Sequence, residues 1–198
     1  MFQNLKTSLV QNMVNNGMID KEDAELYCFG FDTLKIYLYA IVITLGIGFV
    51  MHSVVESIVF LIAFKLLRTT AGGYHTSNYL RCFCASSVLL TVALEIIKYN
   101  KYFSLWVILL IVFINILMVF LLAPLPDDNK PLSPKERVYH KKKSRIVVIL
   151  ESVFILVTVF CNKTMAVTVL MAQVSVTLLL LSWVIKRKLQ LNKKEIQV

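Results

Sequence analysis

The chain has 198 residues, of which 58% are hydrophobic, and its mean hydropathy is +0.72. Soluble domains usually contain about 45 to 50% apolar residues, so this composition excludes an ordinary water-soluble domain and indicates an integral membrane protein. The formal net charge is +9, but the basic residues gather beside apolar runs, as membrane topology requires, so the charge does not indicate nucleic-acid binding.

Residues 1–34 are predicted to form an N-terminal region of interfacial helices, followed by a membrane domain at 35–198. The first apolar residues of the N-terminal region recur at helical spacing opposite polar ones, which indicates an amphipathic helix in the headgroup plane. The same face could instead dock a peptide. These apolar residues are Phe2, Leu5, Leu9, Val10, Met13 and Val14. Asp20, with Asp23 three residues later, then predicts the N-cap of a short helix that leads to Gly30.

The fold class predicted for the rest of the chain is an all-α polytopic membrane protein with about six transmembrane helices. The predicted spans are 36–51, 53–67, 80–97, 102–125, 146–161 and 164–185. Two uncharged runs, 102–126 and 164–185, contain 25 and 22 residues, and a helix needs about 20 to cross a bilayer. Residues 36–67 leave two readings open, since they fit two short spans that turn near His52 and Ser53 or one long span with a tail.

The distribution of basic residues predicts the orientation. Six spans divide the 21 Lys and Arg residues into 18 on one side and three, Lys98, Lys101 and Lys163, on the other. The positive-inside rule makes the richer side cytoplasmic. Both termini, residues 68–82 and a basic loop at 126–145 would then face the cytosol of a multi-pass membrane protein. The loop is predicted to contact anionic lipid, with an acidic substrate as the alternative.

Residues 68–82, RTTAGGYHTSNYLRC, lie at a predicted membrane boundary and contain His75 and Cys82. A thiol attacks as the thiolate, and a nearby imidazole can take its proton, so the pair indicates nucleophilic catalysis. In one straight helix the two residues would lie about 10 Å apart along the axis. Gly72 and Gly73 are therefore expected to bend the chain, so that a loop with His75 folds back toward Cys82 at the start of the next helix.

The order Arg68, Gly73, His75 and Cys82, together with YCFGFDTLK before the first span, resembles the signature of the accessory gene regulator B (AgrB) family. The resemblance implies a cysteine endopeptidase of the bacterial cell membrane that processes the precursor of a cyclic autoinducing peptide in quorum sensing. It implies that His75 is the general base and Cys82 the nucleophile, and that the site requires Arg68 and Gly73. An acyl-enzyme thioester would lead to a thiolactone or lactone ring.

The resemblance also implies the partners: an AgrD-like precursor with an acidic C-terminal tail, and a second copy of the chain in a homodimer. Lys65 and Arg68 are three residues apart and would share a helix face, which could hold that tail or reach lipid phosphate. No metal or other cofactor is expected. The four cysteines, Cys28, Cys82, Cys84 and Cys161, show no disulfide framework and are expected to be reduced.

The main alternative is a small membrane transporter or metal-handling protein, in which Cys82, Cys84, His75 and also His52 are soft ligands for copper or zinc. A Cys-x-Cys pair is weak evidence for such a site. A non-enzymatic assembly protein is the third reading.

Overall fold

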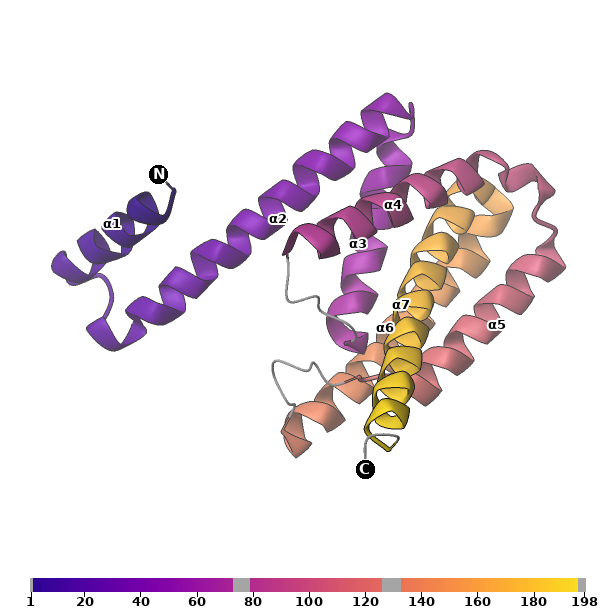
Figure 1. Cartoon of the computed structure of the whole chain (residues 1–198). Coiled ribbons are helices and arrows are strands. Elements are labelled where there is room, and N and C mark those ends of the chain that lie inside the picture. Colours follow the sequence, from indigo (N-terminus) through magenta and orange to yellow (C-terminus); the bar gives the residue numbers. More distant parts are fainter. Residues whose placement is uncertain (1, 73–78, 126–132, 196–198) are drawn as a thin grey trace. The chain divides into compact units, whose positions relative to one another are not determined.

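The computed structural model describes residues 2–72, 79–125 and 133–195, and their side chains within 7–72, 84–125 and 133–189. The regular structure of these residues is helical, which confirms the all-α class (Figure 1). Two compact units, Met1–Ile43 and Thr44–Val198, make up the chain. The helices are α1 (Phe2–Asn15), α2 (Ala24–Val50), α3 (Val54–Ala71), α4 (Tyr79–Lys98), α5 (Leu105–Leu122), α6 (Pro134–Cys161) and α7 (Lys163–Glu195), with short 3-10 turns η1 (Lys21–Asp23) and η2 (Asn100–Tyr102).

The N-terminal unit has the predicted helix α1 but departs from prediction after it. Asp20 precedes η1 and makes no side-chain cap hydrogen bond. α2 begins at Ala24 and continues through Gly30 to Val50, so the prediction of a separate short helix leading to Gly30 is wrong. A glycine inside a helix costs only about 1 kcal/mol, and the apolar residues that follow it continue the same helix. The predicted division after residue 34, drawn at the membrane boundary, stays a prediction.

Six helices, α2 to α7, overlap the six predicted spans, although α2 and α6 begin well before them and α7 ends well after. Within the described residues, four stretches are long and apolar enough to cross a membrane: Lys21–Val50, Leu105–Leu122, Pro134–Cys161 and Lys163–Leu189. α3 is more polar, since its 18 residues include Glu56, Lys65 and Arg68. The chain is therefore a multi-pass membrane protein by its apolar helices, and the number of six crossings stays a prediction.

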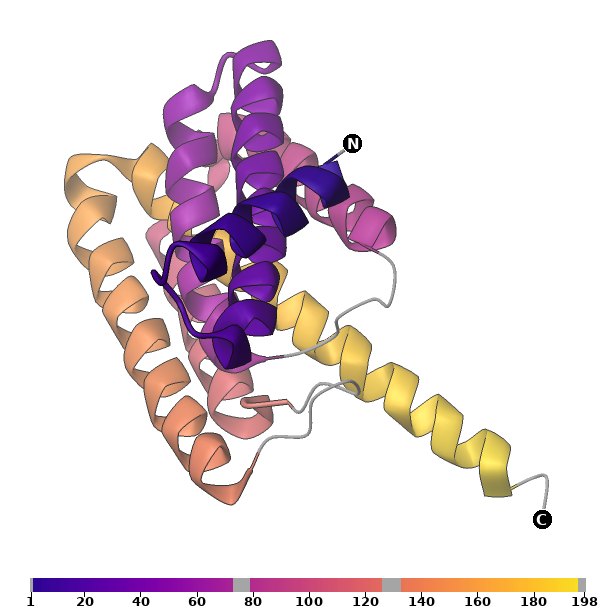
Figure 2. The same cartoon turned by 90° about the vertical axis from the view of Figure 1, so that its left-hand side faces the viewer.

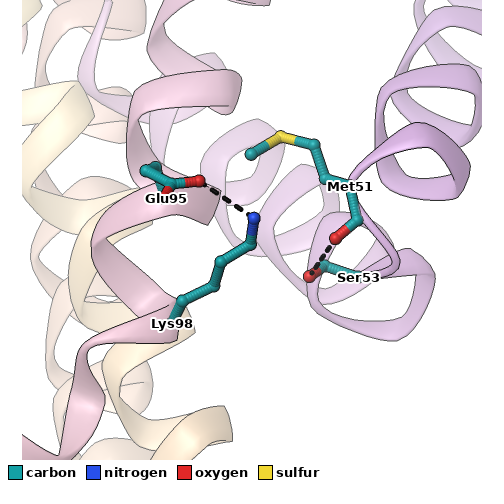
Figure 3. A network of polar contacts seen from close by, with 4 residues as sticks. All are labelled: Met51, Ser53, Glu95 and Lys98. Carbon is teal, nitrogen blue, oxygen red and sulfur yellow. Dashed lines mark hydrogen bonds and ion pairs between the residues drawn. The ribbon is translucent and has the colours of Figure 1, made fainter.

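The turn between α2 and α3 lies where the two-helix reading of residues 36–67 placed it. α2 ends at Val50 and α3 begins at Val54. Between them, His52 adopts a left-handed φ of 53° and the Ser53 hydroxyl donates to the Met51 carbonyl at 3.2 Å (Figure 3). Residues 36–67 therefore form two helices, and whether they cross the membrane as two spans or as one span with a tail stays a prediction.

α7 is the central helix of the C-terminal unit. It packs against α3, α4, α5 and α6, and 61% of its spanning segment is buried, against 11 to 28% in the other three candidate spans. Its polar groups bond to neighbouring helices. The Thr177 hydroxyl donates to Asn115 Oδ1 of α5 at 2.6 Å, and Gln173 Nε2 lies 3.3 Å from both the Val148 carbonyl and Ser152 Oγ of α6. Because hydrocarbon offers no hydrogen bonds, these groups need partners inside the protein.

The helix ends of this unit meet in two groups. At one end, η2 meets the start of α7, where the Asn100 amide donates to the Thr164 hydroxyl at 3.1 Å. At the other end, α3 meets the chain just after α5, where the Leu125 N–H donates to the Ala71 carbonyl at 3.1 Å. From α5 to α7 the chain runs back and forth between these ends (Figures 1 and 2).

Surface charges on α4 are paired locally. Glu95 and Lys98 form an exposed ion pair at 2.9 Å near the C-terminal end of the helix (Figure 3). Exposed pairs of this kind contribute at most about 1 kcal/mol to stability, so this pair is not what holds α4 in place.

The predicted basic loop at 126–145 is shorter than expected, because α6 begins at Pro134. A capping box starts the helix: the Glu136 N–H donates to Ser133 Oγ at 3.3 Å, and the Ser133 N–H donates to Glu136 Oε2 at 2.9 Å. Ser at the N-cap, Pro at the first helical position and Glu at the third form a recognised start signal. Residues 134–145 are therefore helical, and the prediction of a loop there is wrong.

Two glycines of α2 provide a matched test of the α2–α3 turn. A Cβ at Gly48 would lie 2.0 Å from Ser57 Oγ of α3, whereas a Cβ at Gly46 would have nothing within 4 Å. Gly48→Ala is expected to destabilise the detergent-solubilised protein by about 1 to 3 kcal/mol through overpacking. Gly46→Ala should be neutral or stabilise by up to about 1 kcal/mol, because alanine favours helix. Equal effects on denaturant-induced unfolding would contradict the close approach at Gly48.

Candidate functional site

The predicted site residues lie at the C-terminal end of α3, at the N-terminal end of α4 and in the segment between these helices. Lys65 and Arg68 are in the last turns of α3, and Cys82 is in the first turn of α4. Gly73, His75 and the side chain of Cys82 lie outside the described residues. The structure therefore describes the two helix ends that carry the segment, and the distance between imidazole and thiol stays a prediction.

Arg68 is bonded to the end of its own helix. Its side chain is half-buried, and its guanidinium donates to the carbonyl oxygen of Gly72, the residue that follows α3. The last carbonyls of a helix have no partners within the helix and carry partial negative charge, so a cation is favourable there. Lys65 is also half-buried and lies one turn earlier, as expected for two positions on one helical face.

Gly72 bends the chain at the end of α3. Its φ is 72° and its ψ is −154°, a conformation that glycine adopts far more easily than other residues. Gly72 and Leu125 form a parallel β-bridge, and a Cβ at Gly72 would lie 2.3 Å from the Leu125 carbonyl oxygen. The bend predicted from the Gly72–Gly73 pair is therefore confirmed at Gly72.

The start of α4 matches the position predicted for the nucleophile. α4 begins at Tyr79, so Cys82 belongs to its first turn, where the helix dipole favours an anion such as a thiolate. Cys84 is two residues further on, which puts the two positions on different sides of the helix. Cys84 is an exposed free thiol, and Cys28 and Cys161 are also free, as predicted.

One part of the site was not predicted. Leu125 lies far from Gly72 in the sequence, and the two meet through backbone atoms. A backbone contact leaves no mark in side-chain pattern, so no sequence signal could have found it. The metal-site alternative gains no support among the described side chains, where no three His, Cys, Asp or Glu residues come together; that finding does not extend to His75 or the Cys82 thiol.

Comparisons with known proteins give a consistent result. The family model for AgrB, accessory gene regulator B, matches residues 6–185. AgrB-like proteins of Clostridium perfringens strain 13 (type A) and strain SM101 (type A) are each 24% identical to the chain over 162 residues, which is 78% of this chain and 75% of each relative. A further AgrB-like protein of strain 13 is 27% identical over 105 residues, or 53% of this chain and 55% of the relative. No solved structure matches the chain significantly.

The matched residues include all of 68–82 and helices α2 to α6. Members of the matched family are known as peptidases that process the precursors of autoinducing peptides, and the match covers nearly the whole chain. The chain belongs to the accessory gene regulator B family.

Proposed function

We propose that the chain is a membrane-embedded cysteine endopeptidase that removes the C-terminal tail of an AgrD-like peptide precursor, as a step in quorum sensing. The observation that carries the proposal is the family match over residues 6–185, within which Arg68, Gly73, His75 and Cys82 stand in the family order. In this proposal Cys82 is the nucleophile and His75 is the general base.

The local structure supports these roles. A cysteine in the first turn of a helix is well placed to react as a thiolate, because the helix N-terminus stabilises negative charge. The left-handed backbone at Gly72 ends α3 three residues before His75. The chain is then free to leave the helix axis, which is what a His–Cys contact over this short spacing requires.

The proposed reaction has two acyl transfers. His75 takes the proton of the Cys82 thiol, and the thiolate attacks a carbonyl of the precursor. The C–N bond breaks, the tail leaves with the proton from the imidazolium, and the remaining peptide is held on Cys82 as a thioester. A Cys thiol or Ser hydroxyl within the precursor then attacks this thioester, closes a thiolactone or lactone ring and releases the Cys82 thiol. Exclusion of water prevents loss of the acyl-enzyme to hydrolysis.

Charged groups beside the segment suit the proposed partners. Lys65 and Arg68 on α3 place two cations near the site, where an acidic precursor tail would be attracted. The first turns of α6 present exposed basic residues to anionic lipid headgroups. The protein would work as a homodimer. These exposed residues are Lys135, Arg137, Lys141, Lys142 and Lys143.

The orientation can be tested with single cysteines in a chain whose four native cysteines are replaced by alanine. Val138, in α6, and Tyr102, in η2, are both exposed, and the positive-inside rule puts them on opposite sides of the membrane. Tyr102→Cys should react with an impermeant maleimide on intact cells, and Val138→Cys only after permeabilisation. Labelling of Val138→Cys on intact cells would refute a cytoplasmic site for precursor cleavage.

The catalytic roles can be tested by substitution. Removing either member of a coupled nucleophile and base removes nearly the whole rate advantage, so Cys82→Ala and His75→Ala should each abolish precursor cleavage at unchanged protein level. Cys84→Ala is the matched control and should keep activity within a few-fold. Equal losses at Cys82 and Cys84, or cleavage that stops with a chelator, would favour the metal-site alternative.

The acyl-enzyme can be trapped with a precursor whose ring-closing Cys is replaced by Ala, because that peptide cannot complete the second transfer. Mass spectrometry of the purified enzyme should then detect a hydroxylamine-sensitive adduct equal to enzyme plus precursor minus tail. The adduct should be missing from Cys82→Ala, while the unaltered precursor should yield the cyclic product. Tail release without any adduct, at equal rates in both enzymes, would rule out the thioester route.

A further inference from the structure

The end of α3 and the chain just after α5 are joined by a backbone hydrogen bond next to the proposed catalytic segment. The Leu125 N–H donates to the Ala71 carbonyl at 3.1 Å, and Gly72 forms a parallel bridge with Leu125. Ala71 is fully buried and Leu125 is 8% exposed. Water cannot replace a hydrogen bond between such buried groups, so breaking this bond would leave a buried donor and acceptor without partners, which is costly in free energy.

Gly72 allows this junction for two independent reasons. Its φ of 72° is in the left-handed region, where a side chain would strain the backbone. An added Cβ would also lie 2.3 Å from the carbonyl oxygen and 3.2 Å from the nitrogen of Leu125. Both obstructing atoms belong to a peptide backbone, which cannot rotate away as a side chain can. Any other residue at position 72 would therefore force α3 and the α5 end apart.

Arg68 holds the next peptide group along the chain. Its guanidinium donates to the Gly72 carbonyl, and a hydrogen bond from a charged donor is about twice as strong as a neutral one. Arg68, Ala71, Gly72 and Leu125 together form what we call the backbone clamp. The chain continues from the clamp directly into Gly73 and His75.

We propose that the backbone clamp is a positioning device for the catalytic segment, and that Gly72 and the Leu125 N–H are its essential parts. The proposal rests on the function proposed above. His75 is only three residues beyond Gly72, so its Cα lies within about 11 Å of the clamp. A displacement of about 1 Å at a reacting group can cost about 100-fold in rate. The clamp fixes the position of Gly72, and therefore the point from which the short segment to His75 begins.

The first arm of the test replaces Gly72 by Ala. This variant is expected to lose about 100-fold in kcat for precursor cleavage, with KM within a few-fold, because positioning and not binding is impaired. Two glycine controls separate the causes. Gly17→Ala also puts a side chain at a positive φ, of 66°, but meets nothing within 4 Å, and Gly48→Ala creates a close contact at a distant turn, mainly with the Ser57 side chain. Both should keep the kcat of the wild type per folded molecule.

The second arm tests the partner strand without touching Gly72. Leu125→Pro deletes the N–H that bonds to Ala71, whereas Leu125→Ala keeps it and removes only side-chain packing. Leu125→Pro should reproduce the kcat loss of Gly72→Ala, and Leu125→Ala should not. If both Leu125 variants lose activity only in proportion to the folded fraction, the clamp is structural and the proposal fails.

A third readout follows the thiol directly. In a background with Cys28, Cys84 and Cys161 replaced by alanine, the rate of Cys82 alkylation against pH reports how far His75 assists the thiol. Gly72→Ala should move this profile to higher pH, toward that of His75→Ala, and amide exchange at Leu125 should become faster. An unchanged profile and kcat in Gly72→Ala would overturn the clamp proposal. If the His75→Ala profile instead equals that of the wild type, the proposed peptidase site itself fails, and exchange at Leu125 still reports on the clamp.

Discussion

The constraint on which the C-terminal unit depends is that the apolar segment of α7 is packed among α3, α4, α5 and α6, with 61% of it buried. Gln173 and Thr177 are buried there, in a segment long and apolar enough to cross a membrane. In such a place a polar side chain needs a hydrogen-bond partner within the protein. Their partners are Asn115 on α5 and the Val148 carbonyl and Ser152 on α6. These hydrogen bonds therefore fix the positions of α5 and α6 along α7, because apolar packing alone would allow the helices to slide.

The packing around α7 also determines which backbone segments meet at the candidate site. Once α5 is held against α7, the chain that leaves α5 reaches Leu125 at the level where α3 ends. α3 packs against α7 and α6, and Leu67 and Ala71 on its last turns are fully buried. The meeting of Ala71 and Leu125 is thus a consequence of how three helices pack around α7. If the segment after Gly72 is catalytic, as proposed, this contact supports the point at which it begins.

The two ends of the proposed catalytic segment have different kinds of support. Before it, Arg68 and the Leu125 backbone hold Gly72 in a conformation that a side chain would not allow. After it, Cys82 belongs to a regular helix from its first turn, where helix geometry and dipole act on the thiol position. In the proposed mechanism, the nucleophile would therefore belong to a regular helix and the base would follow a fixed residue at a distance of three positions.

The sequence by itself determined the membrane class, the approximate helix positions and the family motif at 68–82, because apolar runs and short motifs are local signals, and it offered the turn at 51–53 as one of two readings. It misjudged two boundaries, at Gly30 and at Pro134, although the start signal from Ser133 to Glu136 was present. Tertiary structure alone decided that α7 is central and that Gly72 meets Leu125. Both depend on contacts between residues far apart in the chain, and the second is made by backbone atoms, which every sequence shares.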